Sequence, residues 1–228
     1  MNNFGIFDNL STENKDILQR IFYLIKDKYP DVERANILCE ERSGSKSAQA
    51  LNNIRDTISH LRTVFENWDK PHEFKVKQLA TIEEHLRRAI IEPYELASKK
   101  EIKLLQDNYT NYQDTVLPII YKLNPPPLSV DDVELRIQTI NTLMQDGRRA
   151  KSANDWVPQW EEGCKAFDRA YEQAKQLNRE LKEEIIRADK IVQDKSAFRK
   201  TIYYTSIISI VVGIGLFFFG KYWDKMFK

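Results

Sequence analysis

The sequence predicts an all-α protein, an elongated antiparallel helical bundle or coiled coil that is followed by one C-terminal transmembrane helix. Glycine is scarce, because the 228 residues include only 7 glycines, too few for the many turns of a β-rich domain. Apolar residues recur three and four positions apart over most of the chain, which is the spacing of one helix face. The uncharged run over residues 201–220 is long enough to cross a bilayer as a helix.

Charge balance and cysteine content exclude several classes of protein. Lys plus Arg is 35 against 34 for Asp plus Glu, which gives no general reason to expect a nucleic-acid or acidic partner. Cys39 and Cys164 lie far apart without metal-like spacing, so they predict no disulfide framework and fit a reducing compartment. The N-terminus lacks the basic segment and apolar core of a signal peptide.

Two helices are expected at the start of the chain. Ser11 is placed to cap the first helix, which Pro30 ends or bends. The segment "EERSGSKS" has the composition of a loop. The second helix carries the cleanest heptad pattern, which predicts a seam buried against other helices. The seam positions are Leu51, Ile54, Ile58, Leu61, Phe65 and Trp68.

A very long helix is expected next. The segment "NWDKPHE" predicts a tight turn, with Pro71 suited to a helix start. Two apolar stripes follow, one over residues 79–90 and a second, shifted in phase, over residues 102–119. Pro93 lies between them and predicts a kink. The "NPPPL" segment is interpreted as a rigid connection, with binding to a partner domain as the alternative.

The remaining cytosolic helices are patterned in heptads. Ser129 with Asp132 resembles a capping arrangement for one helix, and "DGRRAKSANDW" is interpreted as a loop or a frayed end. The last helix begins near Trp156 or Pro158 and keeps its register to Val192.

Asn178 falls on the seam of this last helix. A polar residue at such a position can fix the register and oligomeric state of a coiled coil. The alternative is that the helix packs only inside its own bundle, with Asn178 at a partly solvated edge.

Residues 201–220 are interpreted as the membrane helix, since they carry no charge and have aromatic and basic residues at both ends. A short tail crosses a membrane more easily than a charged domain, so we expect a single-pass tail anchor with the N-terminal domain in the cytoplasm and the lipid bilayer as a partner. Ser206, Ser209, Gly213 and Gly220 share one face, where small residues allow a second helix to approach closely.

The expected organisation follows from these elements. Residues 1–123 form an N-terminal helical bundle with the long kinked helix, and 124–129 form a proline-rich linker. Residues 130–200 form heptad-patterned membrane-proximal helices, 201–220 the transmembrane helix, and 221–228 a short basic tail.

One constellation suggests chemistry. Arg55 and His60 lie five residues apart in "RDTISH", and an antiparallel hairpin about residue 70 brings His85 near Arg55. A cation and a histidine could bind a phosphodiester and move a proton during RNA cleavage. The alternative is a set of ordinary hydrogen bonds and ion pairs on helix surfaces. The 3 histidines form no pair with metal-ligand spacing, and no cofactor motif is found, so we expect no metal and no cofactor.

The residues Arg55, Asp56 and His60 resemble the Arg-x4-6-His motif of bacterial HEPN domains. That resemblance implies an all-helical, often dimeric bundle and a ribonuclease in which Arg55 and His60 are catalytic. The order of bundle, linker, membrane-proximal helix and anchor is also similar to the layout of syntaxin-type fusion proteins, as an analogy of architecture alone.

Two functions are therefore predicted. The first is a non-enzymatic, tail-anchored assembly protein that binds itself, as a homo-oligomer, or a helical protein partner. It would couple that state to its membrane helix and could act as a membrane effector. The second is a membrane-tethered HEPN-like ribonuclease, and RNA is a partner only in this alternative.

Overall fold

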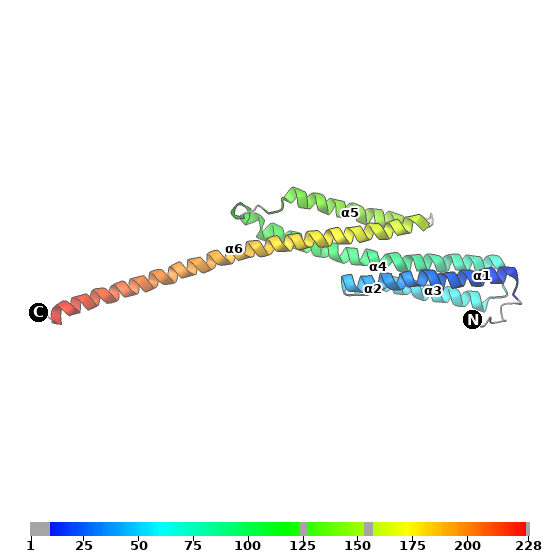
Figure 1. Ribbon diagram of the computed structural model, residues 1–228, viewed down its shortest axis with the longest axis horizontal. Coiled ribbons are helices and arrows are strands. Elements are labelled where there is room, and N and C mark those ends of the chain that lie inside the picture. Colours follow the sequence, from blue (N-terminus) through cyan, green and yellow to red (C-terminus); the bar gives the residue numbers. More distant parts are fainter. Residues whose placement is uncertain (1–9, 124–126, 153–156, 227–228) are drawn as a thin grey trace. The chain divides into compact units, whose positions relative to one another are not determined.

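The computed structural model describes residues 10–123, 127–152 and 157–226, and within them every element is a helix. This all-helical structure agrees with the prediction (Figure 1). In chain order the elements are α1 (Thr12–Tyr23), η2 (Leu24–Lys28), α2 (Tyr29–Ser43), α3 (Ala48–Glu66), α4 (His72–Thr115), η3 (Leu117–Lys122), α5 (Val130–Ser152) and α6 (Val157–Met226).

The chain divides into two compact units. The first comprises residues 1–107 and 129–179, and the second comprises residues 108–128 and 180–228. Helices α4 and α6 each begin in the first unit and end in the second.

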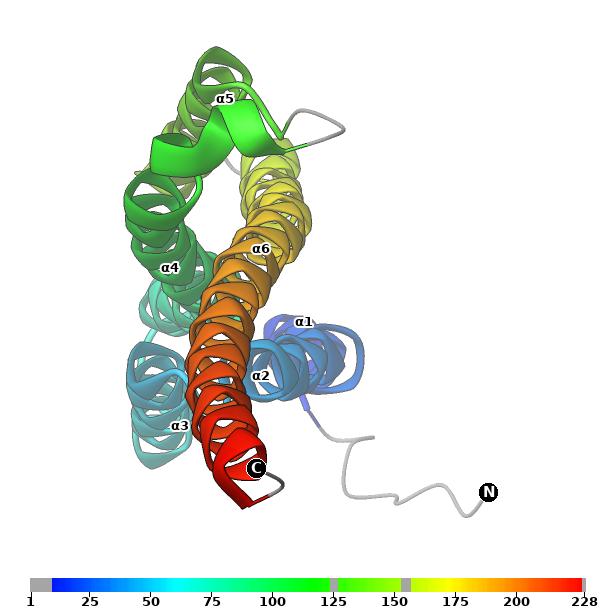
Figure 2. The ribbon, with the colours of Figure 1, turned by 90° about the vertical axis from the view of Figure 1, so that its left-hand side faces the viewer.

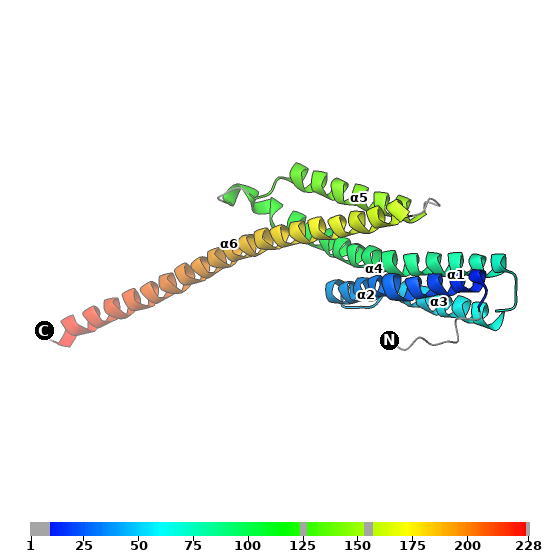
Figure 3. The same ribbon diagram turned by 45° about the vertical axis from the view of Figure 1, so that its right-hand side comes forward.

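The first unit is a helical bundle. Its N-terminal part contains α1, η2 and α2, which follow one another without a gap, together with α3 and the start of α4 (Figure 2). The start of α6 lies beside α5 in Figures 1 and 3. The core of the N-terminal part contains residues from α1, α2, α3 and α4. They include Ile17, Val32, Ala50, Leu79 and Ile82.

Local signals set the helix boundaries in this unit. Ser11 Oγ accepts a hydrogen bond of 3.2 Å from Asn14 N–H, so the predicted cap of α1 is confirmed. Ser129 Oγ accepts from Asp132 N–H at 3.1 Å and caps α5 in the same way. Gly44 ends α2 with φ of 67°, a left-handed conformation that glycine adopts without a steric penalty.

The predicted seam of α3 is confirmed at Ile54, Leu61 and Trp68, which pack against the core, and is wrong at its other three positions. The buried positions are Ala50, Thr57 and Val64, one residue earlier in each heptad than Leu51, Ile58 and Phe65. The latter three are 48%, 61% and 53% exposed. Because only these three of the six positions change, the buried face is rotated by about 50° from the predicted one, half of the roughly 100° between neighbouring residues. Small and β-branched side chains on the inner face let α3 approach its neighbours closely, and the larger side chains remain outside.

The segment "DGRRAKSANDW" was expected to be a loop or a frayed end, but its described residues, 146–152, are helical because α5 continues to Ser152. Its side chains have partners that favour the helix. Arg148 and Lys151 form ion pairs with Glu95 of α4, and the buried Gly147 lies against the ring of Phe167. These contacts between elements are not apparent from the local sequence, which is rich in polar residues and contains glycine.

Helices α5 and α6 meet where each carries a glycine. A Cβ added at Gly147 would lie 2.6 Å from Phe167 Cε1, and one added at Gly163 would lie 2.8 Å from Ile91 Cδ1. Both distances are too short for a real contact, so the close approach depends on the missing side chains. Phe167 is completely buried as a result.

The seam predicted for α6 is buried over most of its length. Phe167, Tyr171 and Ala174 are buried in the first unit, and Leu181 and Ala188 are buried in the second. The side chain of Val192 is 51% exposed. Burial along this face of α6 therefore ends before Val192, although the spacing of three and four residues continues to Val192.

Buried residues of the second unit also come from the end of α4 and the segment after it. Tyr112, Val116 and Leu123 are buried there. The hydroxyl of Tyr112 donates a hydrogen bond to the backbone oxygen of Leu128, which ties α4 to the segment leading into α5. Of the "NPPPL" connection, residues 124–126 lie outside the described part of the chain.

The predicted transmembrane helix at residues 201–220 is wrong, since among the residues that the structure describes no helix is long and apolar enough to cross a membrane. These residues form the later part of α6, a helix of 70 residues. A span needs about 20 consecutive apolar residues. Within residues 201–210 the hydroxyl side chains of Thr205, Ser206 and Ser209 interrupt the apolar run.

We predict that Gly147→Ala destabilises the protein by about 1–3 kcal/mol, the usual cost of overpacking a core. Alanine is the better helix former by about 1 kcal/mol, but its Cβ would overlap the enclosed ring of Phe167. The measurement is the free energy of unfolding in urea. The control is Gln145→Ala, at an exposed position of the same helix, which should be neutral or stabilising. A Gly147→Ala protein as stable as this control would contradict the packing argument.

Candidate functional site

An apolar groove lies between η2–α2 and α3 in the first unit. Its volume is about 260 Å³, and carbon atoms form nearly all of its surface. Three of its side chains are largely open to solvent, with exposed fractions of 53% for Ile25, 38% for Tyr29 and 61% for Ile58. The other lining residues are Leu24, Ile54, Thr57, Leu61, Ile82 and Leu86.

The rotation of α3 creates this open surface. Ile58 belongs to the outward heptad stripe of Leu51, Ile58 and Phe65, and Phe65 stacks on Trp68 with ring centroids 6.0 Å apart. Large apolar side chains that remain exposed together in a folded bundle are typical of a surface that binds another protein. The heptad pattern identified these side chains, but their exposure depends on how α3 packs.

Charged pairs flank the exposed stripe on α3. The guanidinium of Arg55 lies 3.0 Å from the Asp56 carboxylate, and that of Arg62 lies 2.7 Å from Glu66. Both arginine side chains are about three-quarters exposed, at 73% and 75%. An apolar strip with a polar rim of both charge signs is the usual anatomy of a protein interface.

Two of the three predicted catalytic residues come together between α3 and α4. The rings of His60 and His85 are stacked, with centroids 5.3 Å apart and an angle of 23° between their planes. His60 Nδ1 lies 2.7 Å from Gln78 Oε1, and His85 Nδ1 lies 3.1 Å from Asn53 Oδ1. Because an amide oxygen only accepts, each neutral ring donates from Nδ1 and leaves Nε2 as an acceptor.

Electrostatics favour the neutral form of His85. Burial lowers the pKa of His85, and the neighbouring His60 lowers it further, against the opposing effects of Asp56 and Glu84. A neutral imidazole with an open Nε2 can accept a proton. The pair is therefore chemically able to act as a base.

Arg55 is placed differently from the histidines. Its guanidinium donates two hydrogen bonds to Asp56, through Nε at 3.1 Å and a terminal nitrogen at 3.0 Å. Residues five apart on an α-helix point about 140° away from each other. Arg55 and His60 therefore lie on different sides of α3. Among the described contacts, none joins Arg55 to either histidine.

Asn178 is buried inside the first unit. Its side chain is 3% exposed, and its amide nitrogen donates to Glu101 of α4, at 3.1 Å to the backbone oxygen and 2.5 Å to Oε1. A polar seam residue thus has partners within its own chain, as expected of a buried amide. Its role in fixing the register between chains stays a prediction.

The remaining predicted residues lie on the later part of α6. Ser206 and Ser209 are exposed, whereas the surroundings of Gly213 and Gly220 lie outside the described part of the structure. In the portion that is described, no three His, Cys, Asp or Glu side chains gather in a way that could hold a metal ion.

A buried ionic network, which sequence reasoning missed, joins α4 to the end of α5. Lys151 Nζ lies 2.7 Å from carboxylate oxygens of both Glu92 and Glu95, and Lys99 Nζ is also 2.7 Å from Glu95. Burial by itself would raise the pKa of Glu95, but hydrogen bonds from Lys151 and Lys99 outweigh it and hold the pKa at about 2. Only the spacing of Glu95 and Lys99, four apart on one helix, was visible as a signal in the sequence.

Comparison with known proteins yields no similarity on which a function could rest: no family model matches the chain, and no curated protein or solved structure matches it either.

Glu95 should make stability depend on pH. Its pKa falls from 4.5 in the unfolded chain to about 2 in the folded one, so its contribution is complete above about pH 4.5 and is lost as the pH falls through 2. At most it amounts to about 3 kcal/mol. We predict that Glu95→Gln lowers the free energy of unfolding at pH 7 and flattens its decline between pH 4.5 and 2.

Urea unfolding across this pH range measures the effect. Glu84→Gln serves as the control, since Glu84 makes an exposed pair with Arg88 at 2.6 Å, and such pairs contribute about 1 kcal/mol or less. An equal effect of the two substitutions would show that the buried network adds nothing to stability.

Proposed function

We propose that the protein is a helical assembly module whose first unit binds a helix of a second copy along the exposed α3 stripe and the adjoining groove. The supporting observation is the placement of Leu51, Ile58 and Phe65 on the solvent side of a folded bundle. Exposing these side chains to water is unfavourable, and covering them stabilises an assembly.

The spacing of the stripe favours a helix as the occupant. Leu51, Ile58 and Phe65 recur every seven residues, and the half-buried Ile54 and Leu61 lie between them. This is the arrangement of a and d positions, which receive side chains of a facing helix. A groove bordered by two roughly parallel rods also suits a helix better than an extended strand, because the described residues offer no sheet edge.

The charges beside the stripe favour a second copy over an unrelated partner. Arg55 with Asp56 and Arg62 with Glu66 place both signs along α3. In a two-fold symmetric pair the same patch faces itself, so each arginine of one copy can meet a carboxylate of the other.

We predict that Ile58→Asp weakens self-association about tenfold or more, because it places a charge at the centre of the apolar stripe, where interface residues contribute most. The measurement is the dissociation constant of full-length protein from sedimentation equilibrium. The control is Leu135→Asp, which introduces the same charge at a 62% exposed position on α5 and should leave self-association unchanged.

A full-length protein that stays monomeric at high concentration would refute the proposal that a second copy occupies the groove. Equal weakening by both substitutions would place the contact elsewhere. Retained helix content, measured by circular dichroism, shows that the two variants remain folded.

A ribonuclease is the second candidate, and the stacked His60–His85 pair is the observation that favours it. Such chemistry needs a proton acceptor and a cation at the phosphodiester. His85 can supply the first, and Arg55 would have to leave Asp56 to supply the second. The exposure of Arg55 makes that movement inexpensive.

If the protein cleaves RNA, replacing both Arg55 and His60 with alanine should abolish the activity while the fold persists. The matched control replaces Arg62, which is equally exposed and ion-paired, together with His72. Cleavage of a single-stranded RNA by full-length protein is the measurement. No cleavage by the unaltered protein, or equal cleavage by both double variants, would exclude this site as the catalyst.

A further inference from the structure

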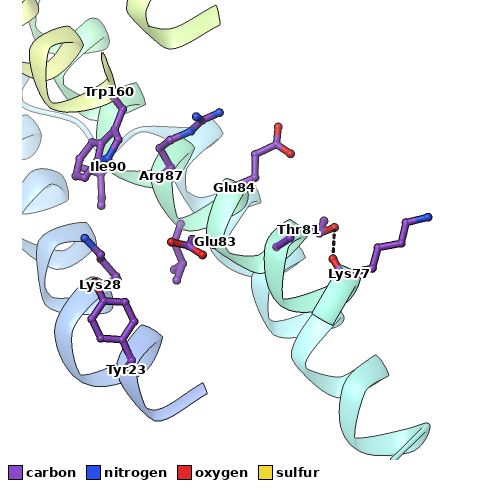
Figure 4. Close-up of a pocket in the computed structure, with 11 residues that line it drawn as sticks. Tyr23, Lys28, Lys77, Thr81, Glu83, Glu84, Arg87, Ile90 and Trp160 are labelled. Atoms are coloured by element: carbon purple, nitrogen blue, oxygen red, sulfur yellow. Dashed lines mark hydrogen bonds between the residues drawn. The ribbon is translucent and has the colours of Figure 1, made fainter. Parts of the chain in front are cut away.

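A second cavity of the first unit adjoins the apolar groove at Leu86 and lies between the end of α1 and the first half of α4. Its volume is about 350 Å³, within the range of small-molecule sites, which begins at about 300 Å³. In Figure 4, Tyr23 and Lys28 face Glu83 across this cavity and Trp160 lies at one end, while Lys77, Glu84 and the guanidinium of Arg87 point away from Lys28. Leu86 and Ile90 add apolar surface.

The π-helical turn η2 builds one wall of the cavity. Tyr29 N–H donates to Leu24 O, five residues back, and Pro30 follows directly. Proline has no N–H, and its ring crowds the carbonyl oxygen four residues earlier, so a regular α-helix is disfavoured here. A π turn brings residues five apart onto one side. Lys28 Nζ consequently lies 5.9 Å from the centre of the Tyr23 ring.

Three cations surround a single carboxylate in this region. Arg20, Lys28 and Arg87 each lower the pKa of Glu83, although burial has the larger effect and raises it. Among the described residues, none of the three cationic side chains lies within ion-pair distance of a carboxylate, including Glu83. The nearby Glu84 is paired with Arg88 at 2.6 Å. The side of the cavity around Glu83 therefore carries an excess of positive charge.

Aromatic rings complete the site. Lys28 Nζ is 5.7 Å from the centre of the Trp160 ring and thus lies close to both Trp160 and Tyr23. Trp160 is partly buried against the core cluster, which holds its ring in place. An anion drawn to Lys28 would come within reach of both rings.

We propose that this cavity binds a small anion that carries a planar ring, such as a phosphate ester or a free carboxylate of an aromatic group. Its anionic group is bound by Lys28 and by Arg87, which turns inward from the rim of the cavity, and its ring packs against Trp160. A guanidinium and an ammonium that lack ion-pair partners are suited to phosphate or carboxylate oxygens. The proposal does not depend on self-association, because no residue of the exposed α3 stripe lines this cavity.

Glu83 regulates this site through its charge. An anion beside a carboxylate raises the pKa of that carboxylate, so binding takes up a proton and becomes tighter as the pH falls. The titratable groups around the cavity and Glu83 are Asp16, Arg20 and Tyr23 on α1, Lys28 on η2, and Lys77, Glu83, Glu84 and Arg87 on α4, while α6 contributes the neutral Trp160.

The test is titration of full-length protein with adenosine monophosphate, with inorganic phosphate and choline as comparison probes. Binding is followed by calorimetry and by the NMR signal of the Trp160 indole N–H, assigned from Trp160→Phe. We expect the nucleotide to bind and to shift this signal.

Lys28→Met and Arg87→Met should each weaken binding about tenfold or more, the loss expected for one charge-assisted hydrogen bond. Glu83→Gln should tighten binding up to about fivefold at pH 7 and remove the part of its pH dependence that comes from Glu83, leaving the part that comes from the phosphate, which titrates at about pH 6.

The matched control is Lys77→Met, since Lys77 borders the cavity but points away from it, and it should bind like the unaltered protein. Three results would overturn the proposal: no nucleotide binding at millimolar concentration, phosphate binding as tightly as the nucleotide, or choline binding in its place. Weakening by Glu83→Gln would also overturn it, because a cation ligand needs that carboxylate.

Discussion

The first unit depends on α4, because every other helix of that unit bonds to it or packs on it. Lys75 reaches α1 through Asn14 Oδ1 at 2.7 Å, and Lys100 reaches the end of α2 through Ser43 O at 3.1 Å. Ser98 Oγ donates to Phe167 O of α6 at 2.7 Å, and Glu95 binds Lys151 of α5. Several of these groups are buried, so each would be costly to leave unpaired. A continuous helix carries them all, and their spacing along it determines where the other helices lie.

Packing against α4 also decides which surfaces remain open. The side of α3 that meets the bundle carries small residues such as Ala50, and its larger apolar side chains are left in solvent as a consequence. On the other side of α4, the π turn of η2 prevents the α1–α2 rod from following a regular helical path. The apolar groove and the anion cavity share Leu86 of α4 but differ in chemistry. The groove is lined by apolar side chains, whereas the cavity also has cations and aromatic rings.

The positions of the helices could be predicted from the sequence wherever regularly spaced apolar residues and capping residues lie within the same segment. The stripe over residues 79–90 is buried as expected, with Leu79, Ile82 and Leu86 in the core, and the turn before α4 lies where Pro71 places it. The candidate site was harder to predict. The hairpin brought His60 and His85 together, but a spacing rule cannot show that Arg55 turns toward Asp56. The end of α5 was misread because its partners, Glu95 and Phe167, are far away in the chain.

The sequence by itself determined the class of secondary structure, the caps and most of the inner faces, because these depend on residues within a few positions of each other. Tertiary structure decided the rotation of α3, the helical state of residues 146–151 and the pairing of Asn178 with Glu101. It also decided the excess of cations around Glu83. Each of these features depends on which side chains from distant segments come into contact. The regular spacing of apolar residues along the sequence contains no information about such contacts.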